Sequence, residues 1–341
     1  MSKEIADYNP SAPGQKGSLF GLPHTREDAE VVIYPVTWEA TVSYNSGTAF
    51  GPTAILEASA QLDLELPNQE SPWKRGIWMS TLNGKTKAKS DLLRSQIKPY
   101  IDSLEGGKEF EGADELLEKA NKATESLRLR IFEETLDYIK EGKKVGLLGG
   151  DHSCPLGFID ALSTQYADFG ILQIDAHMDL REAYEGFTHS HASIMYNALK
   201  NPQVSKLVQV GIRDYCDEEL DYVNEQGGRV SVFYDEEVKN QLFAGESWKS
   251  IVQAIIGQLP QQVYISFDID GLQPFLCPGT GTPVPGGLNF DQAIYLLTAV
   301  KESGREIIGF DLCEVAPLAN DREWNANVGA RLLYRLCGLI G

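Results

Sequence analysis

The sequence has few cysteines, and it lacks any long hydrophobic run. Its five cysteines form no Cys-X-X-Cys pair, which indicates the reduced thiols of a cytosolic protein. No apolar stretch approaches the length of a membrane span, and the first residues lack the apolar core of a signal peptide. We therefore expect a cytoplasmic protein with no membrane partner.

Basic residues are also scarce, since 30 Lys and Arg stand against 49 Asp and Glu, giving a formal net charge of -19. This balance argues against a nucleic-acid partner, because phosphates require a basic surface. The negative field permits a cationic substrate. The net negative charge is equally explained by the solubility of an acidic protein.

Histidine is rare as well, yet four of the five histidines lie in or beside segments rich in aspartate. In Asp175-Ala176-His177-Met178-Asp179 the polar residues alternate after an apolar run. In extended backbone such residues face the same side, so three metal ligands converge at the end of a strand. Two further strand-like runs are followed by the pair Asp268 and Asp270 and by His152.

These segments supply six candidate metal ligands, namely His152, Asp175, His177, Asp179, Asp268 and Asp270. Carboxylates and neutral imidazoles without thiolate suit Mn(II), and less selectively Fe, Co or Zn. Six ligands exceed the need of one tetrahedral ion, so we expect two ions that lower the pKa of a bridging water and support hydrolysis. Each of these segments alone could form a turn or a helix cap. Their joint occurrence in one chain favours a metal site.

Strand-like and helix-like segments alternate along the chain. Apolar runs of strand length occur at 31–35, 144–148, 169–174, 207–212, 230–234, 263–267 and 306–312. Helical candidates lie at 51–58, 113–142, 191–200, 217–226, 247–257 and 289–304. This alternation predicts a doubly wound parallel sheet with helices on both faces, in which ligands bind outside the carboxyl ends of the strands.

We assign residues 1–341 to a single domain with an elaborated N-terminal third. Residues 1–30 are polar and rich in Gly and Pro, which predicts an arm on the surface or on a neighbouring subunit. Residues 63–112 show no clear periodicity, so we expect an irregular insertion there.

The three ligand segments, read in order, resemble the signature motifs of the ureohydrolase (arginase/agmatinase) family. They are Gly149-Gly150-Asp151-His152-Ser153, the Asp175 to Asp179 run, and Ser266-Phe267-Asp268-Ile269-Asp270-Gly271-Leu272. Residues 44–56 are similar to the family's glycine-rich loop and first helix, 279–283 to the loop after the ligands, and 309–315 to its last core strand. The similarity extends over roughly residues 30–341.

The resemblance implies a three-layer α/β/α sandwich with a mostly parallel sheet of roughly eight strands, assembled as a homotrimer or homohexamer. It also implies two Mn(II) ions per subunit and hydrolysis of a guanidino group to an amine and urea. One ion would be held by His152, Asp175, Asp179 and Asp268. The other would be held by His177, Asp175, Asp268 and Asp270, with Asp175 and Asp268 bridging.

Guanidinium is a poor electrophile, so its hydrolysis requires a strong nucleophile, a complementary charge and a proton for the leaving amine. A carboxylate at a strand end can accept two N–H bonds from guanidinium, and Glu314 is expected in this role. His191 is expected to relay the proton, with His189 as the less favoured candidate. Asp179 is counted with the catalytic residues, and Thr282 is expected to contact the substrate.

The loop after Asp179 lacks the Asn of arginases and reads Leu180-Arg181-Glu182-Ala183-Tyr184-Glu185, followed by a Ser-His-Ala sequence similar to agmatinases. Agmatine, hydrolysed to putrescine and urea, is therefore the expected substrate, with Glu182 or Glu185 binding its far amine. Arg181 is expected to form a salt bridge with Glu182 or a neighbouring subunit. If it pointed inward, it would instead bind a guanidino acid such as guanidinobutyrate.

Three other possibilities stay open. Free guanidine is the substrate if the arm or the insertion closes the pocket. Hydrolysis of formimidoylglutamate would require a site for two carboxylates, which the net charge disfavours. A catalytically silent family member would be expected to have lost ligands, whereas all six are present here.

Overall fold

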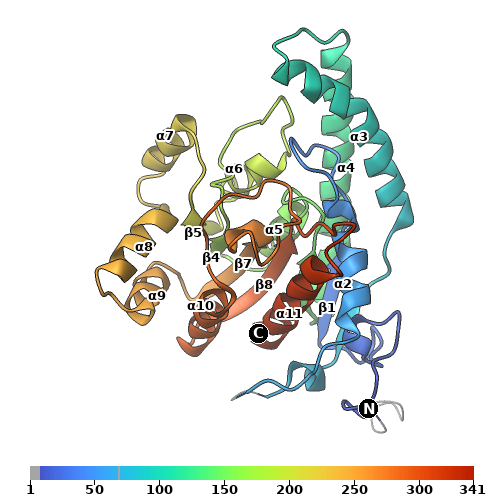
Figure 1. Ribbon diagram of the computed structural model, residues 1–341, viewed down its shortest axis with the longest axis vertical. Helices are drawn as coiled ribbons and strands as arrows, with labels where there is room; N and C mark the ends of the chain where they lie inside the picture. The colour runs from blue at the N-terminus through green and yellow to red at the C-terminus, as the bar shows by residue number, and fades with distance from the viewer. Residues whose placement is uncertain (1–7, 68–69) are drawn as a thin grey trace.

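The computed structural model describes residues 8–67 and 70–341, and within them an eight-stranded sheet forms the centre of the molecule (Figure 1). All neighbouring strands pair in parallel, in the order β2-β1-β3-β8-β7-β4-β5-β6. The strands are β1 (Val31–Pro35), β2 (Ile77–Met79), β3 (Lys144–Leu148), β4 (Phe169–Ile174), β5 (Val204–Ile212), β6 (Val230–Tyr234), β7 (Gln262–Asp268) and β8 (Glu306–Cys313).

Helices cover both faces of the sheet, because its strands carry apolar side chains on both sides. In β1, Val31 and Ile33 belong to one hydrophobic core, whereas Val32 and Tyr34 belong to the other. The first core is covered by α2 (Gly51–Ser59), α8 (Asp235–Phe243), α9 (Trp248–Gly257), α10 (Phe290–Glu302) and α11 (Trp324–Leu339). The second is covered by α3 (Gly84–Glu105), α4 (Ala113–Lys140), α5 (Leu156–Ser163), α6 (Ile194–Ala198) and α7 (Asp217–Glu225).

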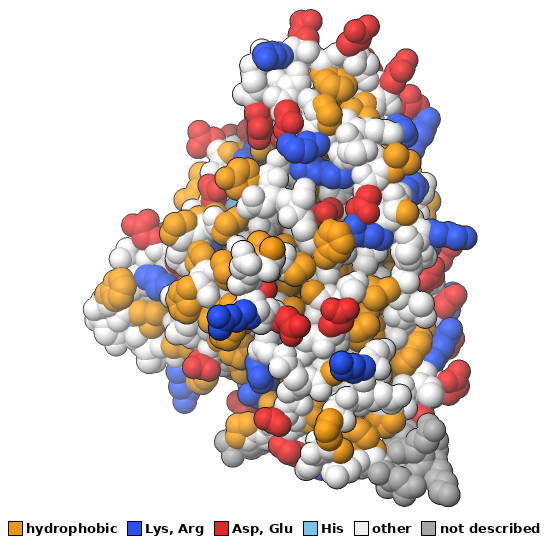
Figure 2. All heavy atoms as spheres, turned by 45° about the vertical axis from the view of Figure 1, so that its right-hand side comes forward, with side chains coloured by type: hydrophobic (Ala, Val, Ile, Leu, Met, Phe, Trp, Pro, Cys, Tyr) orange, Lys and Arg blue, Asp and Glu red, His pale blue; other side chains and the backbone are white. Residues whose placement is uncertain are grey.

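This architecture confirms the predicted three-layer fold, and all seven predicted strands are present. Helices also occupy most of each predicted helical segment, although 191–200 is divided between a 3-10 turn and the short α6. The short edge strand β2 and the helices α3, α5, α8 and α11 were not predicted. Acidic and basic side chains are interspersed over the face shown in Figure 2.

The predicted irregular insertion at 63–112 was wrong for its second half, which contains the 22-residue helix α3. Leu93, Ile97 and Ile101 are buried along one stripe of this helix, at the spacing of a helical face. Asn83 begins the helix, since its side chain accepts hydrogen bonds from two backbone N–H groups of the first turn. Pro99 and the many charged residues obscured this periodicity in the sequence.

The predicted surface arm was also wrong in part, because Leu19–Gly21 form a buried 3-10 turn. The Phe20 ring packs edge-on against Tyr334 of α11, with 4.9 Å between the ring centroids. The backbone N–H of Phe20 donates a 2.8 Å hydrogen bond to Oγ of Ser59 in α2. Apolar residues within a polar segment therefore anchor it to its own chain. Residues 1–7 of the predicted arm lie outside the described residues.

The topology determines where the candidate ligands meet. In a parallel sheet all carboxyl ends lie along one edge, and the four central strands β3, β8, β7 and β4 are adjacent. The segments carrying His152, Glu314, Asp268 and Asp175 follow or end these four strands. In the described part of the chain, no helix has the length and apolar character needed to cross a membrane.

Candidate metal centre

The first group of candidate ligands surrounds the imidazole of His152. Its Nδ1 lies 2.9 Å from Oδ2 of Asp179, 3.1 Å from Oδ2 of Asp175 and 3.5 Å from Oδ2 of Asp268. All four side chains are buried. Side-chain atoms of candidate ligands from three separate segments of the chain therefore converge at one point.

A second group lies around His177. Its Nδ1 is 3.2 Å from Oδ2 of Asp270 and 3.6 Å from Oδ1 of Asp175. Asp175 belongs to both groups, with one carboxylate oxygen directed to each. Five of the six predicted ligands thus form two overlapping His/Asp groups that could hold metal ions, and Asp268 lies beside the first group, 3.5 Å from His152.

The electrostatics of the cluster fit divalent cations. Burial, followed by repulsion from neighbouring carboxylates, raises the pKa of Asp268 well above its ordinary value. Burial and then Asp175 raise the pKa of Asp179 to about 7. Burial also raises the pKa of Asp175, but hydrogen bonds from His152 and His177 outweigh this effect and lower it overall. Buried carboxylates repel one another, and a bound cation would relieve this repulsion. A metal ion that prefers oxygen and nitrogen ligands suits such a cluster.

Two site residues adopt backbone conformations that L-amino acids rarely use. Asp179 has a φ of 56° and Glu314 has a φ of 66°. Left-handed backbone at a residue other than glycine costs roughly 1 kcal/mol or more. The surrounding structure holds both residues in place, as is common at functional sites.

Glu314 presents a buried carboxylate oxygen without a hydrogen-bond partner. Its Oε1 accepts a 2.8 Å hydrogen bond from the backbone N–H of His152, whereas Oε2 has no partner within the described residues. Burial first, and then Asp151, raise the pKa of Glu314 well above its ordinary value. A Cβ at Gly281 would lie 2.9 Å from Oε2, so glycine leaves space beside this oxygen. A cationic hydrogen-bond donor would satisfy it.

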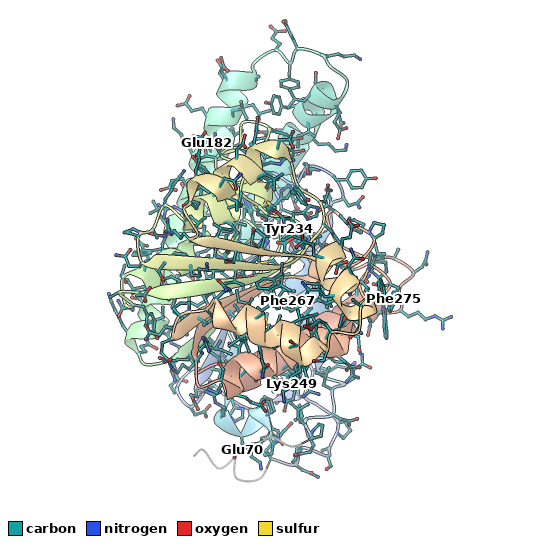
Figure 3. The ribbon with its side chains drawn as sticks, turned by 90° about the vertical axis from the view of Figure 1, so that its left-hand side faces the viewer. Glu70, Glu182, Tyr234, Lys249, Phe267 and Phe275 are labelled. Carbon is teal, nitrogen blue, oxygen red and sulfur yellow. The ribbon has the colours of Figure 1, made fainter. Side chains whose placement is uncertain are left out.

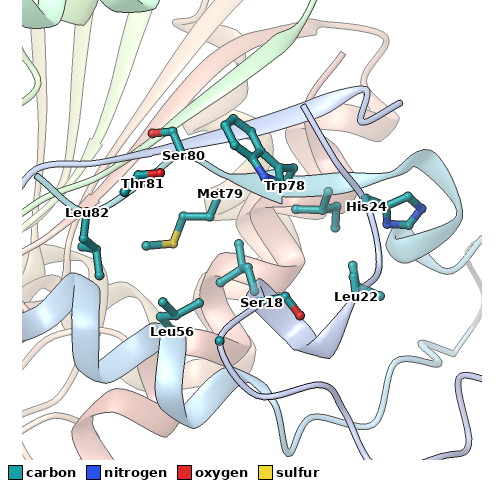
Figure 4. Close-up of a pocket in the computed structure, with 12 residues that line it drawn as sticks. Ser18, Leu22, His24, Leu56, Trp78, Met79, Ser80, Thr81 and Leu82 are labelled. Carbon is teal, nitrogen blue, oxygen red and sulfur yellow. The ribbon is translucent and has the colours of Figure 1, made fainter. Parts of the chain in front are cut away.

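A pocket of about 140 Å³ opens beside the cluster. Four predicted site residues contribute to its lining, namely His177, Asp179, His191 and Thr282. It is also lined by residues that the sequence analysis did not assign to substrate, including Ser43, Tyr184, Asp214 and Tyr215. A larger cavity of about 420 Å³ lies between the N-terminal segment and β2 (Figure 4), but no candidate metal ligand lines it.

The two histidines after the metal loop have different surroundings. Nε2 of His191 lies 3.3 Å from Oγ of Ser43, within the pocket lining. Burial, followed by the charges of His177 and His152, lowers the pKa of His191 to about 3, so its imidazole is neutral at pH 7. Nδ1 of His189 instead lies 3.8 Å from Glu125 of α4, and His189 is not among the residues that line the pocket.

The structure does not place Glu182 or Glu185 in the pocket lining. Glu182 is exposed and lies apart from the centre of the sheet, where Figure 3 labels Phe267. Glu185 is half-buried, and burial followed by the charge of Glu105 raises its pKa. The pocket lining therefore does not support the expectation that these two carboxylates bind a remote amine. Asp214 does line the pocket, and its 65% exposed side chain has Oδ2 at 3.8 Å from Nε2 of His177.

Arg181 lines the same pocket, and its expected partner Glu182 is not the one found. Its guanidinium lies over the ring of Tyr184, 4.7 Å from the centroid, and Nε is 3.9 Å from Oε2 of Glu219. The carboxylate of Glu219 also accepts the backbone N–H groups of Leu180 and Cys216. Glu219 therefore holds the base of the loop together while Arg181 faces the pocket.

Comparisons with known proteins agree with this geometry. The family model described as the arginase family matches residues 29–338. The chain is 33% identical over 318 residues to the N(1)-aminopropylagmatine ureohydrolase of Thermus thermophilus, covering 92% of each protein. It is 31% identical over 305 residues to the agmatinase of Bacillus anthracis, covering 89% of each. This chain belongs to the arginase, or ureohydrolase, family.

The fold is likewise similar to a solved structure described as the agmatine ureohydrolase of Thermoplasma volcanium. The TM-score is 0.69 at 20% sequence identity, and the match covers 99% of this chain and 97% of the other. At this identity the likeness concerns the arginase-like fold alone.

Proposed function

We propose that this protein is a binuclear manganese hydrolase that cleaves a guanidino C–N bond and releases urea, with agmatine as the leading candidate substrate. The observation that carries this proposal is that Glu314, whose Oε2 has no partner in the described structure, is hydrogen-bonded through Oε1 to the backbone of His152 in the first of the two His/Asp groups. A metal site beside a buried anionic acceptor suits a planar cation that must be attacked by water.

The metal ions would be held by the residues that converge in the structure. His152, Asp175, Asp179 and Asp268 would hold one ion, and His177, Asp175, Asp268 and Asp270 the other. When bound, such ions lower the pKa of water and supply a nucleophile at neutral pH. Manganese is proposed because the donors are carboxylates and imidazoles without thiolate.

The chain's own groups would bind the substrate and move its protons. Glu314 would accept N–H bonds from the guanidinium and orient its central carbon toward the metal site. Its Oε1 is already held by the N–H of His152, so Oε2 is the free acceptor. His191, neutral and held beside Ser43, would relay a proton to the leaving amine. Thr282 would contact the substrate from the opposite loop.

Two features support a cationic substrate such as agmatine. Two relatives with more than 30% identity are named for agmatine or its aminopropyl derivative, the agmatinase of Bacillus anthracis and the N(1)-aminopropylagmatine ureohydrolase of Thermus thermophilus. Asp214 offers an exposed carboxylate in the pocket lining, where it would pair with a remote amine.

A guanidino acid is the second candidate, because Arg181 also lines the pocket. A guanidinium above an aromatic ring is well placed to bind a carboxylate in a bidentate manner. A cationic substrate would therefore be bound through Asp214, whereas a guanidino acid would be bound through Arg181.

The test is a urea-release assay of the manganese-loaded protein against agmatine, aminopropylagmatine, arginine, guanidinobutyrate and guanidine. Formamide release from formimidoylglutamate is measured in parallel. We expect agmatine to be preferred over arginine by a wide margin, because the loop after Asp179 lacks the Asn of arginases and Asp214 in the pocket lining would repel a carboxylate. Comparable rates on arginine and agmatine would contradict the agmatinase-like proposal, and turnover confined to guanidine or formimidoylglutamate would replace it.

Two variants separate the leading candidates. For a cationic substrate, Asp214→Asn should raise KM while Arg181→Gln leaves it unchanged or lower. For a guanidino acid the pattern should be reversed. We also propose a homotrimer or homohexamer, which light scattering of the purified protein would distinguish.

A further inference from the structure

The helical hairpin formed by α3 and α4 projects from one side of the sheet and contacts the loop that leads to His191 (Figure 1). Three hydrogen bonds join them. The hydroxyl of Tyr100 donates to the carbonyl of Glu185 at 3.0 Å. The side-chain amide of Asn121 donates to the carbonyl of Gly186 at 3.1 Å and accepts from the N–H of Thr188 at 2.9 Å.

The loop needs this support because its backbone is strained. Glu185 and Gly186 both have left-handed φ angles, of 55° and 85°. At Glu185 this conformation costs roughly 1 kcal/mol or more. The turn directs Phe187 into the protein, where its fully buried ring packs edge-on against Tyr100 at 5.9 Å between centroids.

Close packing fixes the same turn. A Cβ at Gly186 would lie 2.8 Å from a methyl group of Leu117 in α4. The side chain of Leu117 therefore packs against Gly186, in the space that a Cβ there would occupy.

The hairpin also holds the opposite wall of the pocket. Arg94 of α3 donates hydrogen bonds to the carbonyl of Val42 and, at 3.2 Å, to Oγ of Ser46. Ser43 lies between these two positions, and its hydroxyl is 3.3 Å from His191. The same pair of helices is thus attached to both loops whose side chains meet in the pocket.

We propose that the α3–α4 hairpin is a clamp that positions the two substrate-binding loops, residues 42–46 and 184–191, with Tyr100, Asn121 and Arg94 as positioning residues. None of the three lines the pocket. They act by placing Tyr184, His191 and Ser43 around the substrate. This inference rests on the proposed function for its kinetic consequence, but its structural consequence is independent of any substrate.

The experiment compares Asn121→Ala and Tyr100→Phe with the wild type. Each lost hydrogen bond is expected to raise KM about fivefold, since one such bond contributes about 1 kcal/mol, while kcat falls less than KM rises. Amide hydrogen exchange of residues 182–190 should accelerate in both variants, with manganese content unchanged. Asn121→Asp keeps the acceptor for Thr188 but loses the donor, so it should be intermediate.

Gln96→Ala is the matched control. Gln96 accepts a 2.6 Å hydrogen bond from Lys119 and so joins α3 to α4 without touching either loop. It should leave both KM and loop exchange unchanged. Equal effects in this control and in Asn121→Ala would mean that the hairpin only stabilises the fold, and the clamp would be rejected.

The two readouts separate this inference from the proposed function. Unchanged exchange of residues 182–190 in both Tyr100→Phe and Asn121→Ala would overturn the clamp whatever the substrate. If exchange accelerates in the variants but the wild-type protein hydrolyses no guanidino compound, the clamp proposal is supported and the proposed hydrolase function is contradicted. Tyr100→Phe removes one oxygen atom and keeps the ring that packs on Phe187, so it tests the idea even if Asn121→Ala fails to fold.

Discussion

The side-chain amide of Gln173 donates a 2.8 Å hydrogen bond to Oδ2 of Asp175, the carboxylate shared by both ligand groups. Gln173 is itself held by Gln209, whose amide donates to Oε1 of Gln173 at 2.6 Å. Both glutamines are fully buried and lie side by side on β4 and β5. This buried relay orients the carboxylate that would bridge two ions.

Gln173→Leu is therefore predicted to weaken manganese binding by about 10- to 100-fold, the usual effect of removing a group that orients a metal ligand. Leucine retains most of the buried volume, so the protein should still fold. Calorimetric titration with Mn(II) measures the effect. Gln253→Leu, on the exposed surface of α9, serves as the control. Equal affinity in the two variants would show that the relay does not orient Asp175.

The two ligand groups should respond differently to mutation. Replacing Asp175 or Asp268 with alanine should abolish binding of both ions, because each is a proposed bridge. His152→Ala should mainly weaken one ion, since His177 and Asp270 remain to hold the other. Metal analysis of manganese-saturated protein distinguishes these outcomes. At most one ion per chain in the wild type would refute the binuclear site.

Glu314→Gln is expected to preserve the metal content and lower kcat/KM. The amide cannot form a charge-assisted pair with guanidinium. Loss of this pair is expected to remove about 2 to 4 kcal/mol of transition-state stabilisation. Steady-state kinetics with parallel metal analysis tests this. Near-wild-type kcat/KM would exclude Glu314 as a substrate ligand.

The two histidines of the loop provide a matched pair. His191→Ala should lower kcat by about 100-fold or more without changing the metal content, because proton transfer typically contributes this much. His189→Ala should have little effect on kcat, since His189 lies beside Glu125 and not in the pocket lining. The reverse result would exchange their assignments.

Much of the candidate metal centre was predictable from the sequence because most of its candidate ligands cluster within short segments. Asp175, His177 and Asp179 alternate directly after a strand, and parallel strands end along one edge, so the ligand segments had to be near one another. Gln173 and Gln209 also left a signal, as lone polar residues inside apolar strands. That signal was not used.

The sequence alone therefore predicted seven of the eight strands, the candidate ligands and the family resemblance, since each depends on short patterns of polarity along the chain. Only the tertiary structure decided that β3, β8, β7 and β4 are neighbours and that Asp214 rather than Glu182 lines the pocket. It likewise decided that a helix, not an irregular insertion, contacts the substrate loops through Arg94 and Tyr100. These relationships join residues about 50 to 160 positions apart, and they arise from helix packing and loop conformation, which local sequence patterns do not encode.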